Sequence, residues 1–496
     1  MKKLTALILM LALALTLCAC GTTTEETAEP AAASDESAVT VGISLPGNSA
    51  ERFYSDGRYL QEQFEAAGYQ VILEYTDAES GDQDKDVLGL IEQGAEVLLI
   101  AAVDSDAFSD SMAEAKAQGI PVVAYDRLIN GTDAVSAYVS FDNYAVGELQ
   151  GAFIRDALDL DNADGPFNLE IAAGSPTDPN AAYVYHGGMD VLQPYIDAGK
   201  LMVPSGETSF EQCAVNQWDT ALTRDRFEGI LAEHYTDGTV LDAVFSGSDS
   251  VGLGVIQALA KGYAGGSKPV VTGQDANIDN LRCMAVGVQA MTVYKNFADE
   301  AAVAFAVSRA LLEGRTPDGS LVSDLPVEAA FDAETYNNGV LAVPSYLLVP
   351  DVITAENLDK LTETGQYQWD AGHTYLEAAG SDGQDLAGML LGTWEGRCTS
   401  EGGIASDDGQ DHRWEYKADG TYVYYVKDGD GWTPGDDTLN EYFVAGDLLC
   451  TRWVENGAEY LEWWEIAIDG DTMHWSAPRQ GDDGSTSTVT FEMTRV

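Results

Sequence analysis

The chain has 496 residues, of which 45% are hydrophobic and 22% charged. This length exceeds what a single hydrophobic core organises, so two or three domains are expected. Its 82 acidic side chains against 25 lysines and arginines give a formal net charge of −57. No basic cluster interrupts this acidic background, which excludes a nucleic-acid partner and means that an anionic membrane surface would repel the chain.

The N-terminus has the layout of an export signal. Two lysines precede an apolar stretch at residues 4–17, which is too short to span a bilayer. The letters LCACG at residues 17–21 resemble the bacterial lipobox. This resemblance implies a lipoprotein signal peptide at residues 1–20 and a lipid such as palmitate on Cys20, which would anchor the chain on the extracytoplasmic side of the cell membrane. The alternative is an ordinary cleaved signal with two incidental cysteines. Residues 21–38 have almost nothing to bury and predict a disordered tether.

From residue 39 onward, apolar strands alternate with helical segments. Runs rich in Val, Ile and Tyr predict strands at residues 39–45, 70–76, 97–103, 121–125 and 137–141. Segments 51–68 and 106–119 have apolar residues at helical spacing and end in Gly. The alternation starts again with apolar runs at residues 167–175, 241–249 and 268–276. Two such units in tandem predict two doubly wound α/β lobes, at residues 39–370, with a cleft between them.

The composition and the hydrophobic periodicity of the chain change after residue 370. Residues 371–385 are rich in Gly, Ala and Asp and predict a linker, whereas residues 386–496 contain short aromatic strands separated by Asp-Gly and Asn-Gly turns. This pattern predicts a small all-β barrel, and its first and last strands resemble those of lipocalins in a generic way. Its tryptophans either fill the interior or line a pocket. A second ligand, a cell-wall glycan contact and a spacer role all stay open for this domain.

Four cysteines follow the signal, at positions 213, 283, 398 and 450. None forms a C-x-x-C pair, so no zinc site is predicted. In an exported protein, Cys398 with Cys450 and Cys213 with Cys283 are candidate disulfides, and the sequence settles neither pairing.

The residues that follow the predicted strands are the candidate site, because ligands of doubly wound sheets bind at the carboxyl ends of the strands. These positions carry Arg52, Phe53, Asp126, Arg127, Asn180, Asp249 and Asp275, and the later segments add Trp218 and Lys295. Carboxylates and Arg forks suit vicinal hydroxyl groups, and aromatic rings cover the C–H faces of a sugar ring. The alternative for each Asp alone is a helix N-cap or a turn. The recurrence at five strand ends favours a ligand site, with Asp126 and Arg127 as a clamp on adjacent hydroxyls.

The order of motifs carries a family resemblance. Residues 39 to about 370 resemble the sugar-binding proteins of bacterial ABC transporters, in the xylose-binding and multiple-monosaccharide-binding branch, through the segments SAERF, VVAYDRLI, SFDNYAVGELQG, GSPTDPNA and VTGQDANIDNLRCMAVGVQAMTVYK. The resemblance implies a type I periplasmic-binding-protein fold whose two lobes close on one sugar by a hinge. It assigns the polar residues of the candidate site to sugar hydrogen bonds and Trp218 to an aromatic wall. Phe53 stands where the family commonly has Trp, which leaves the sugar preference open.

The resemblance also implies a function. We expect a lipid-anchored, monomeric receptor that captures a monosaccharide such as xylose, glucose or galactose and delivers it to an ABC permease. The alternatives are a sugar sensor that serves a chemoreceptor or a two-component kinase, and a glycan-processing enzyme. No G-x-S-x-G, H-E-x-x-H or Walker motif occurs, so no enzyme activity and no cofactor are predicted. A calcium-loop-like stretch at residues 159–170 has Asp164 where such loops require Gly, so no metal is predicted either.

Overall fold

The computed structural model describes residues 38–47, 52–77, 81–236, 238–263, 265, 268–369, 375–379, 386–401, 404–405, 411–429, 431–435, 438–455, 458–480 and 486–496. The predictions for the signal peptide, for Cys20 and for residues 21–37 lie outside these residues. The chain divides into Met1–Ala38 and Val39–Val496, and all the described helices and strands belong to the second unit.

The first lobe is built on a seven-stranded sheet. Its order is β11 (Ala329–Asp332), β12 (Ser345–Leu348), β5 (Val135–Phe141), β4 (Val122–Tyr125), β3 (Val97–Ile100), β1 (Thr40–Gly47) and β2 (Gln70–Asp77). All neighbours are parallel except β11 with β12. The five strands predicted in the first half are confirmed. Their buried, Val- and Ile-rich sequences are typical of parallel strands that helices cover on both faces.

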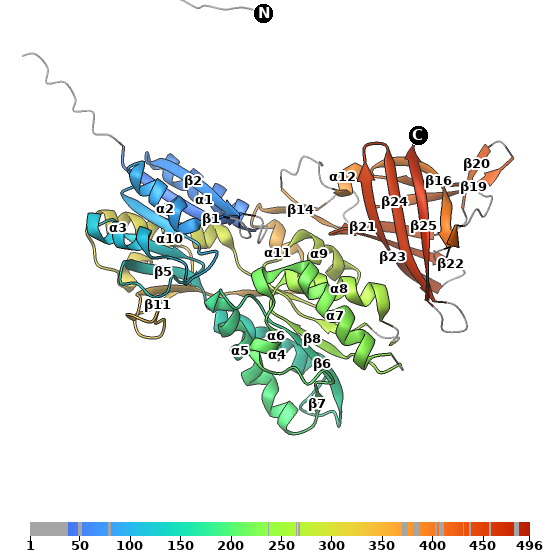
Figure 1. The fold of residues 1–496 in the computed structure, drawn as a ribbon, viewed down its shortest axis with the longest axis horizontal. Coiled ribbons are helices and arrows are strands. Elements are labelled where there is room, and N and C mark those ends of the chain that lie inside the picture. The colour runs from blue at the N-terminus through green and yellow to red at the C-terminus, as the bar shows by residue number, and fades with distance from the viewer. Residues whose placement is uncertain are drawn as a thin grey trace, which may run out of the picture. The chain divides into compact units, whose positions relative to one another are not determined.

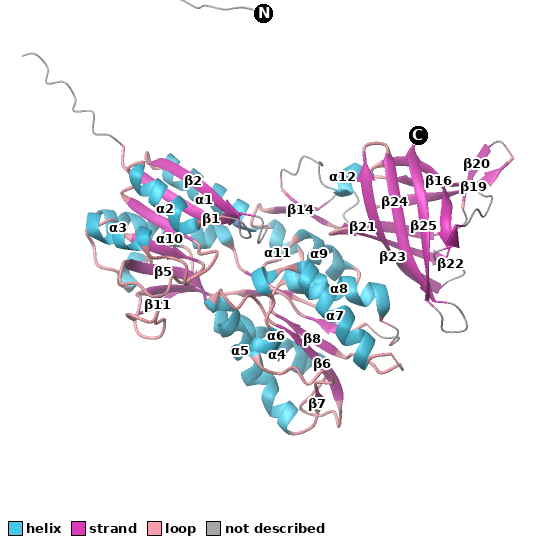
Figure 2. Cartoon of the chain, viewed as in Figure 1, coloured by secondary structure: helices cyan, strands magenta, loops and turns pink. Residues whose placement is uncertain are grey.

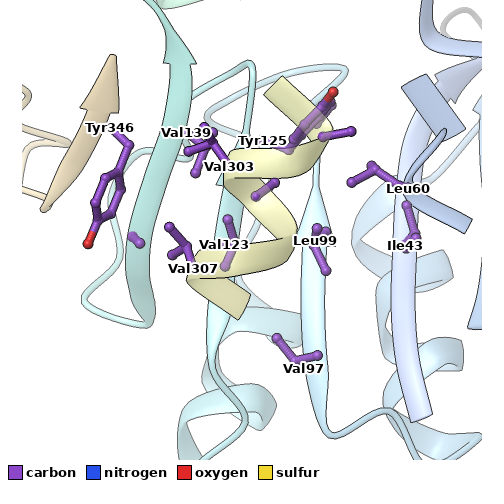
Figure 3. Close-up of a cluster of buried hydrophobic side chains, with 14 of the residues drawn as sticks. Ile43, Leu60, Val97, Leu99, Val123, Tyr125, Val139, Val303, Val307 and Tyr346 are labelled. Carbon is purple, nitrogen blue, oxygen red and sulfur yellow. The ribbon is translucent and has the colours of Figure 1, made fainter. Parts of the chain in front are cut away.

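Four helices cover this sheet: α1 (Arg52–Ala66), α2 (Gln83–Glu92), α3 (Asp110–Gln118) and α10 (Phe297–Leu312). Helix α3 ends at Gly119, whose φ of 72° gives the left-handed cap that only Gly adopts without strain. Figure 3 shows Val303 and Val307 of α10 against Val123 and Val139 of the sheet, in one buried apolar cluster.

The second lobe has a parallel sheet in the order β7 (Leu201–Met202), β6 (Phe167–Ala172), β8 (Ala243–Ser246) and β9 (Val270–Val271). Its helices are α4 (Asn143–Ala157), α5 (Pro179–Asp197), α6 (Phe210–Cys213), α7 (Thr220–His234), α8 (Asp249–Gly262) and α9 (Ile278–Ala285). Glycines let α4 and α5 approach closely: a Cβ added to Gly147 would lie 1.9 Å from the Val184 carbonyl oxygen.

The two lobes are not consecutive halves of the chain, which corrects the expectation of two tandem units. The chain leaves the first lobe after Phe141, returns after Tyr294 to form α10, β11 and β12, and leaves again after Leu348. It then forms β13 (Asp351–Ile353), which pairs with β10 (Thr292–Tyr294). The physical reason is that β11 and β12 complete one edge of the first sheet and α10 packs on one of its faces, so the chain crosses between the lobes three times. Figure 1 shows α10, in yellow, beside the blue elements of the first lobe. A hinge between domains consists of a few loop residues at such crossings.

A short segment after β13 packs on the second lobe. It contains α11 (Asp359–Thr362), β14 (Tyr367–Trp369) and β15 (Leu376–Ala378). Apolar side chains of this segment share a buried cluster with Leu281, Met284 and Tyr294.

The C-terminal domain is all-β, as predicted (Figure 2). After α12 (Leu386–Leu390), an antiparallel sheet runs in the order β20 (Gly431–Pro434), β19 (Tyr422–Asp428), β18 (His412–Tyr416), β16 (Gly392–Glu401), β25 (Thr486–Arg495), β24 (Thr472–Gln480), β23 (Ala458–Asp469), β22 (Leu448–Glu455) and β21 (Thr438–Ala445), with β17 (Ile404–Ala405) beside β16. A bridge between Thr421, which directly precedes β19, and Glu441 of β21 joins strands from opposite sides of the curved sheet. Trp394 and Trp475 are fully buried inside it.

Cys213, Cys283, Cys398 and Cys450 are buried, and neither candidate disulfide is formed in this structure. Within the described part of the chain, no helix combines the length and the apolarity that a membrane crossing requires.

Candidate functional site

An open cavity, with about 370 Å³ of empty space that includes solvent at its mouth, lies where the carboxyl ends of the strands of both lobes meet. Its walls are Arg52, Phe53, Asp126, Arg127, Asp178, Asn180, Trp218, Ser248, Ser250, Gln274, Asp275 and Lys295. Eight of the nine residues predicted from the sequence are among them. The ninth, Asp249, is not.

All wall residues except Trp218, which ends a short 3-10 helix at Asn216–Trp218, follow the end of a strand. Arg52 and Phe53 begin α1 after β1, and Asp126 follows β4. From the second lobe, Asn180 begins α5 after β6 and Asp275 follows β9. The first lobe therefore supplies one wall and the second lobe the other.

Arg52 is fixed by two carboxylates that the sequence did not single out. Its Nε donates to Asp56 Oδ2 at 3.0 Å and its Nη2 donates to Glu300 Oε2 at 2.6 Å. Burial raises the pKa of Asp56 and of Glu300, and the Arg52 guanidinium opposes this in both. Asp56 also accepts from the Tyr125 hydroxyl. The third nitrogen, Nη1, is left to face the cavity.

The centre of the cavity has buried polar atoms without partners. Arg52 Nη1 lies 3.3 Å from Asp126 Oδ1 and 3.5 Å from Asp275 Oδ1, but none of these three atoms has a hydrogen-bond partner among the described residues. Burial alone would raise the pKa of Asp126, but Arg52, Lys295 and Arg127 hold it below its usual range. Asp126 is therefore an ionised acceptor. Buried polar atoms without partners are rare and require an explanation.

Arg127 lies between the lobes. Its Nη1 donates to the Ala102 carbonyl at 3.0 Å, and its Nε lies 2.9 Å from Asp178 Oδ2 on the second lobe. Its guanidinium also lies over the Phe53 ring, with 5.0 Å to the ring centroid. The ion pair between Asp126 and Arg127 is long, at 3.9 Å. Asp126 and Arg127 thus contact different partners and do not form a close ion pair with each other.

Trp218 forms an aromatic wall that Asp178 orients. The indole Nε1 donates to Asp178 Oδ2 at 3.1 Å. The ring fits because residue 174 is Gly: a Cβ there would lie 2.0 Å from the ring. Asp178 also accepts from the backbone N–H of Asn180 at 2.9 Å and so caps α5.

Asp275 and Lys295 form the second acid–base pair, with 2.9 Å between Oδ1 and Nζ. The segment after β13 supports both from behind. The Tyr367 hydroxyl donates to the Ala276 carbonyl at 3.0 Å. The Tyr294 hydroxyl donates to Gln366 at 2.6 Å, beside Lys295. Residues beyond the last crossing therefore hold the loops of the site.

Asp249 lies behind the cavity wall. Its carboxylate accepts from Gln289 Nε2 at 2.7 Å, Thr292 Oγ1 at 3.0 Å and the backbone N–H of Asn277 at 2.9 Å. Burial, together with the nearby charge of Asp275, raises the pKa of Asp249 to about 8 against the opposing hydrogen bonds. Its geometry is that of a group that holds the loop after β9.

Several site residues have left-handed backbones. Asp126 has a φ of 57°, Trp218 of 58°, Asp275 of 96° and Ala276 of 55°. Such conformations cost about 1–3 kcal/mol each and persist where the surrounding structure determines them, most often at functional sites. Three of these four residues line the cavity.

Three residues that support the cleft, Asp56, Glu300 and Tyr367, are not among those predicted from the sequence. Asp56 carries a signal, because its i, i+4 spacing from Arg52 places both side chains on one helix face. Glu300 and Tyr367 lie in other parts of the chain and carry none. The described residues include no group of three His, Cys, Asp or Glu side chains with metal-site geometry.

The fold and the cavity together define a class of protein: two hinged α/β lobes that enclose a small solute between their strand ends. The chain belongs to the periplasmic binding protein family, since residues 41–316 match the profile described as Periplasmic binding protein domain.

Two curated relatives and two solved structures illustrate the similarity. The multiple sugar-binding periplasmic receptor ChvE of Rhizobium radiobacter is 41% identical over 69% of this chain and 94% of its own length. The D-xylose-binding periplasmic protein of Escherichia coli is 31% identical over 64% of this chain and 88% of its own. A solute-binding protein of Clostridium phytofermentans with bound β-D-glucose has a TM-score of 0.62 at 40% identity, covering 66% of this chain and 98% of that one. A carbohydrate transporter protein of Chloroflexus aurantiacus with D-glucose has a TM-score of 0.57 at 28% identity, covering 67% and 97%.

Proposed function

We propose that the cleft binds one monosaccharide, an aldopentose or aldohexose such as xylose, glucose or galactose, between two lobes that close on it. The observation that carries this proposal is a trio of buried atoms that line the cleft, Arg52 Nη1, Asp126 Oδ1 and Asp275 Oδ1. They make ion-pair contacts but no hydrogen bond among the described residues. A sugar hydroxyl both donates and accepts, so vicinal hydroxyls satisfy the two carboxylates and the guanidinium together. The relatives described as binding D-xylose or D-glucose support the same class of ligand.

The roles follow from the positions. Hydrogen bonds to the sugar are assigned to Arg52, Asp126, Arg127, Asn180, Asp275 and Lys295, and aromatic contacts to Phe53 and Trp218. Asp249 is assigned a supporting role behind Asp275. Closure follows from the site, because only the closed state makes contacts from both lobes, so a sugar favours that state.

The proposal also covers where the receptor is located and where it delivers the bound sugar. The export signal and the lipobox-like LCACG favour a receptor that a lipid on Cys20 holds outside the cell membrane. The solved relative from Clostridium phytofermentans is described as an ABC transporter solute binding protein, which favours delivery to an ABC permease by a monomeric receptor without enzymatic activity. A sensor that reads the same closed state is the alternative.

The test uses the chain from residue 38 to residue 496, without the signal. Thermal unfolding and calorimetric titration are measured with xylose, glucose, galactose and arabinose. A true ligand at 100 times its dissociation constant adds about 2.7 kcal/mol of stability. A shift with one or two sugars at one site per chain supports the proposal. The absence of any shift across the panel contradicts it, and release of products from an oligosaccharide would favour the enzyme.

A further inference from the structure

A second pocket lies between the second lobe and the C-terminal domain. Its walls are Arg224, Gln257, Ala260 and Lys261 of α7 and α8, and Asp447, Leu448, Trp463, Glu465 and Ser476 of the C-terminal domain. We propose that this pocket is a second binding site for an uncharged sugar.

The walls of the pocket are held in place by specific contacts. The β21–β22 turn reaches the second lobe, where the Gly446 N–H donates to Asp279 Oδ2 at 2.7 Å. Arg282 Nη1 donates to the Val444 carbonyl at 3.2 Å. A Cβ at Gly446 would lie 2.9 Å from the Gln257 amide nitrogen, so the turn requires Gly for this approach as well as for its φ of 63°. An apolar cluster that includes Ile256 and Phe443 continues the contact.

One buried polar atom at the pocket has no partner among the described residues. Gln257 is 6% exposed, and its Nε2 donates to Asp447 Oδ1 at 3.1 Å. Its Oε1 is the atom that none of the described donors reaches. An acceptor in this position is satisfied by a ligand hydroxyl, and a buried acceptor without a partner destabilises the fold.

The chemistry of the walls indicates the class of ligand. The walls carry two cations, Arg224 and Lys261, and two carboxylates, Asp447 and Glu465. Lys261 Nζ lies 3.2 Å from Glu228 Oε1 beside the pocket and 3.6 Å from Glu465 Oε1. A balanced set of donors and acceptors favours an uncharged ligand that can both donate and accept. Trp463 adds the flat apolar surface that the C–H face of a sugar ring covers. The cleft combines the same four kinds of group: carboxylates, cations, an amide and an aromatic ring.

The test separates the two sites in the chain from residue 38 to residue 496. Asp275→Asn weakens the cleft, and saturation-transfer NMR then measures binding of D-glucose and cellobiose at millimolar concentration. We expect residual binding to Asp275→Asn that falls at least about tenfold when Gln257→Met or Trp463→Ala is added. Trp432→Ala is the matched control, because Trp432 belongs to the same domain but not to the pocket.

The result of this test is distinguishable from the result of the sugar titration that tests the cleft. Sugar binding to Asp275→Asn that Trp463→Ala removes and Trp432→Ala does not supports the second site, even where the wild-type chain shows no tight binding. Absence of binding to Asp275→Asn overturns the proposal, as does residual binding that both Gln257→Met and Trp463→Ala leave unchanged. Melting curves of each variant, compared with the wild type, identify any loss of fold.

Discussion

At the cleft, the charges of neighbouring side chains set the protonation state of a single residue, and hence whether it can accept or donate a hydrogen bond. Asp126 is the clearest case: three cations keep the pKa of this buried carboxyl low, although burial opposes them. Its backbone is left-handed, with a φ of 57°, which directs the side chain of a strand-end residue into the cavity. Removing its charge therefore affects the ligand and the adjacent Arg52 together.

We predict that Asp126→Asn weakens sugar binding by at least about 100-fold, because hydrogen bonds to charged groups contribute about 1.5–3 kcal/mol each. Calorimetric titration with glucose and xylose measures the change. Asp133→Asn is the matched control: Asp133 is half-exposed and pairs with Lys116 on the surface. Unchanged affinity in Asp126→Asn would remove this residue from the site.

Gly174 gives a second prediction at this scale. In Gly174→Ala the new Cβ meets the Trp218 ring at 2.0 Å, so the aromatic wall must move. We expect about 1–3 kcal/mol of lost stability and sugar binding that is weaker by at least about tenfold. Gly89→Ala is the control, since its Cβ meets nothing within 4 Å in α2 and better helix propensity should add about 0.5–1 kcal/mol. Chemical denaturation and titration measure both variants, and wild-type affinity in Gly174→Ala would contradict the role of Trp218.

At the scale of elements, helices and loops from distant parts of the chain together position the side chains of the cleft. Helix α1 brings Arg52 and Asp56, whereas α10 brings Glu300 from 248 residues away. The segment with α11 and β14 supports the loop after β9 through Tyr367. The site is thus an assembly of strand ends and of the elements packed behind them.

Tyr367→Phe tests this support. The variant keeps the ring in its apolar cluster but loses the hydrogen bond to the Ala276 carbonyl, next to Asp275 in its left-handed conformation. One such bond contributes about 0.5–1.5 kcal/mol, so we expect sugar binding to weaken by about three- to tenfold. Tyr69→Phe serves as the control, because Tyr69 packs by its ring against Phe64 and Phe305. Equal affinities of the two variants would show that Asp275 is positioned without Tyr367.

At the scale of the whole molecule, the excess of acid sets the response to pH. The net charge of −57 destabilises the compact state by self-repulsion, and burial raises the pKa of Asp56, Asp178 and Glu300. Burial raises the pKa of Asp249 to about 8, against roughly 4 in an unfolded chain. Between these two values the folded chain holds a proton that the unfolded chain releases, so stability falls as the pH rises through this range.

We therefore predict that the free energy of unfolding is higher at about pH 6 than at about pH 8.5, by about 2 kcal/mol from Asp249 alone. Denaturant titrations at the two pH values measure it. Asp249→Asn has no proton to exchange at this position and should show a smaller difference. A wild-type chain that is more stable at the higher pH would contradict the sign.

The fold class, the all-β C-terminal domain and most of the cleft could be predicted from the order of residues alone. This was possible because parallel strands are continuous apolar runs and their ligands meet the residues that follow them, so Asp126, Asn180 and Asp275 are visible as strand ends. The remaining features depend on tertiary packing. Glu300 and Tyr367 reach the site from distant parts of the chain, and Asp249 points away from the cavity although it follows a strand like the others. The same holds for the three crossings and for the pocket beside Gln257, because contacts between distant segments leave no local pattern of period or spacing.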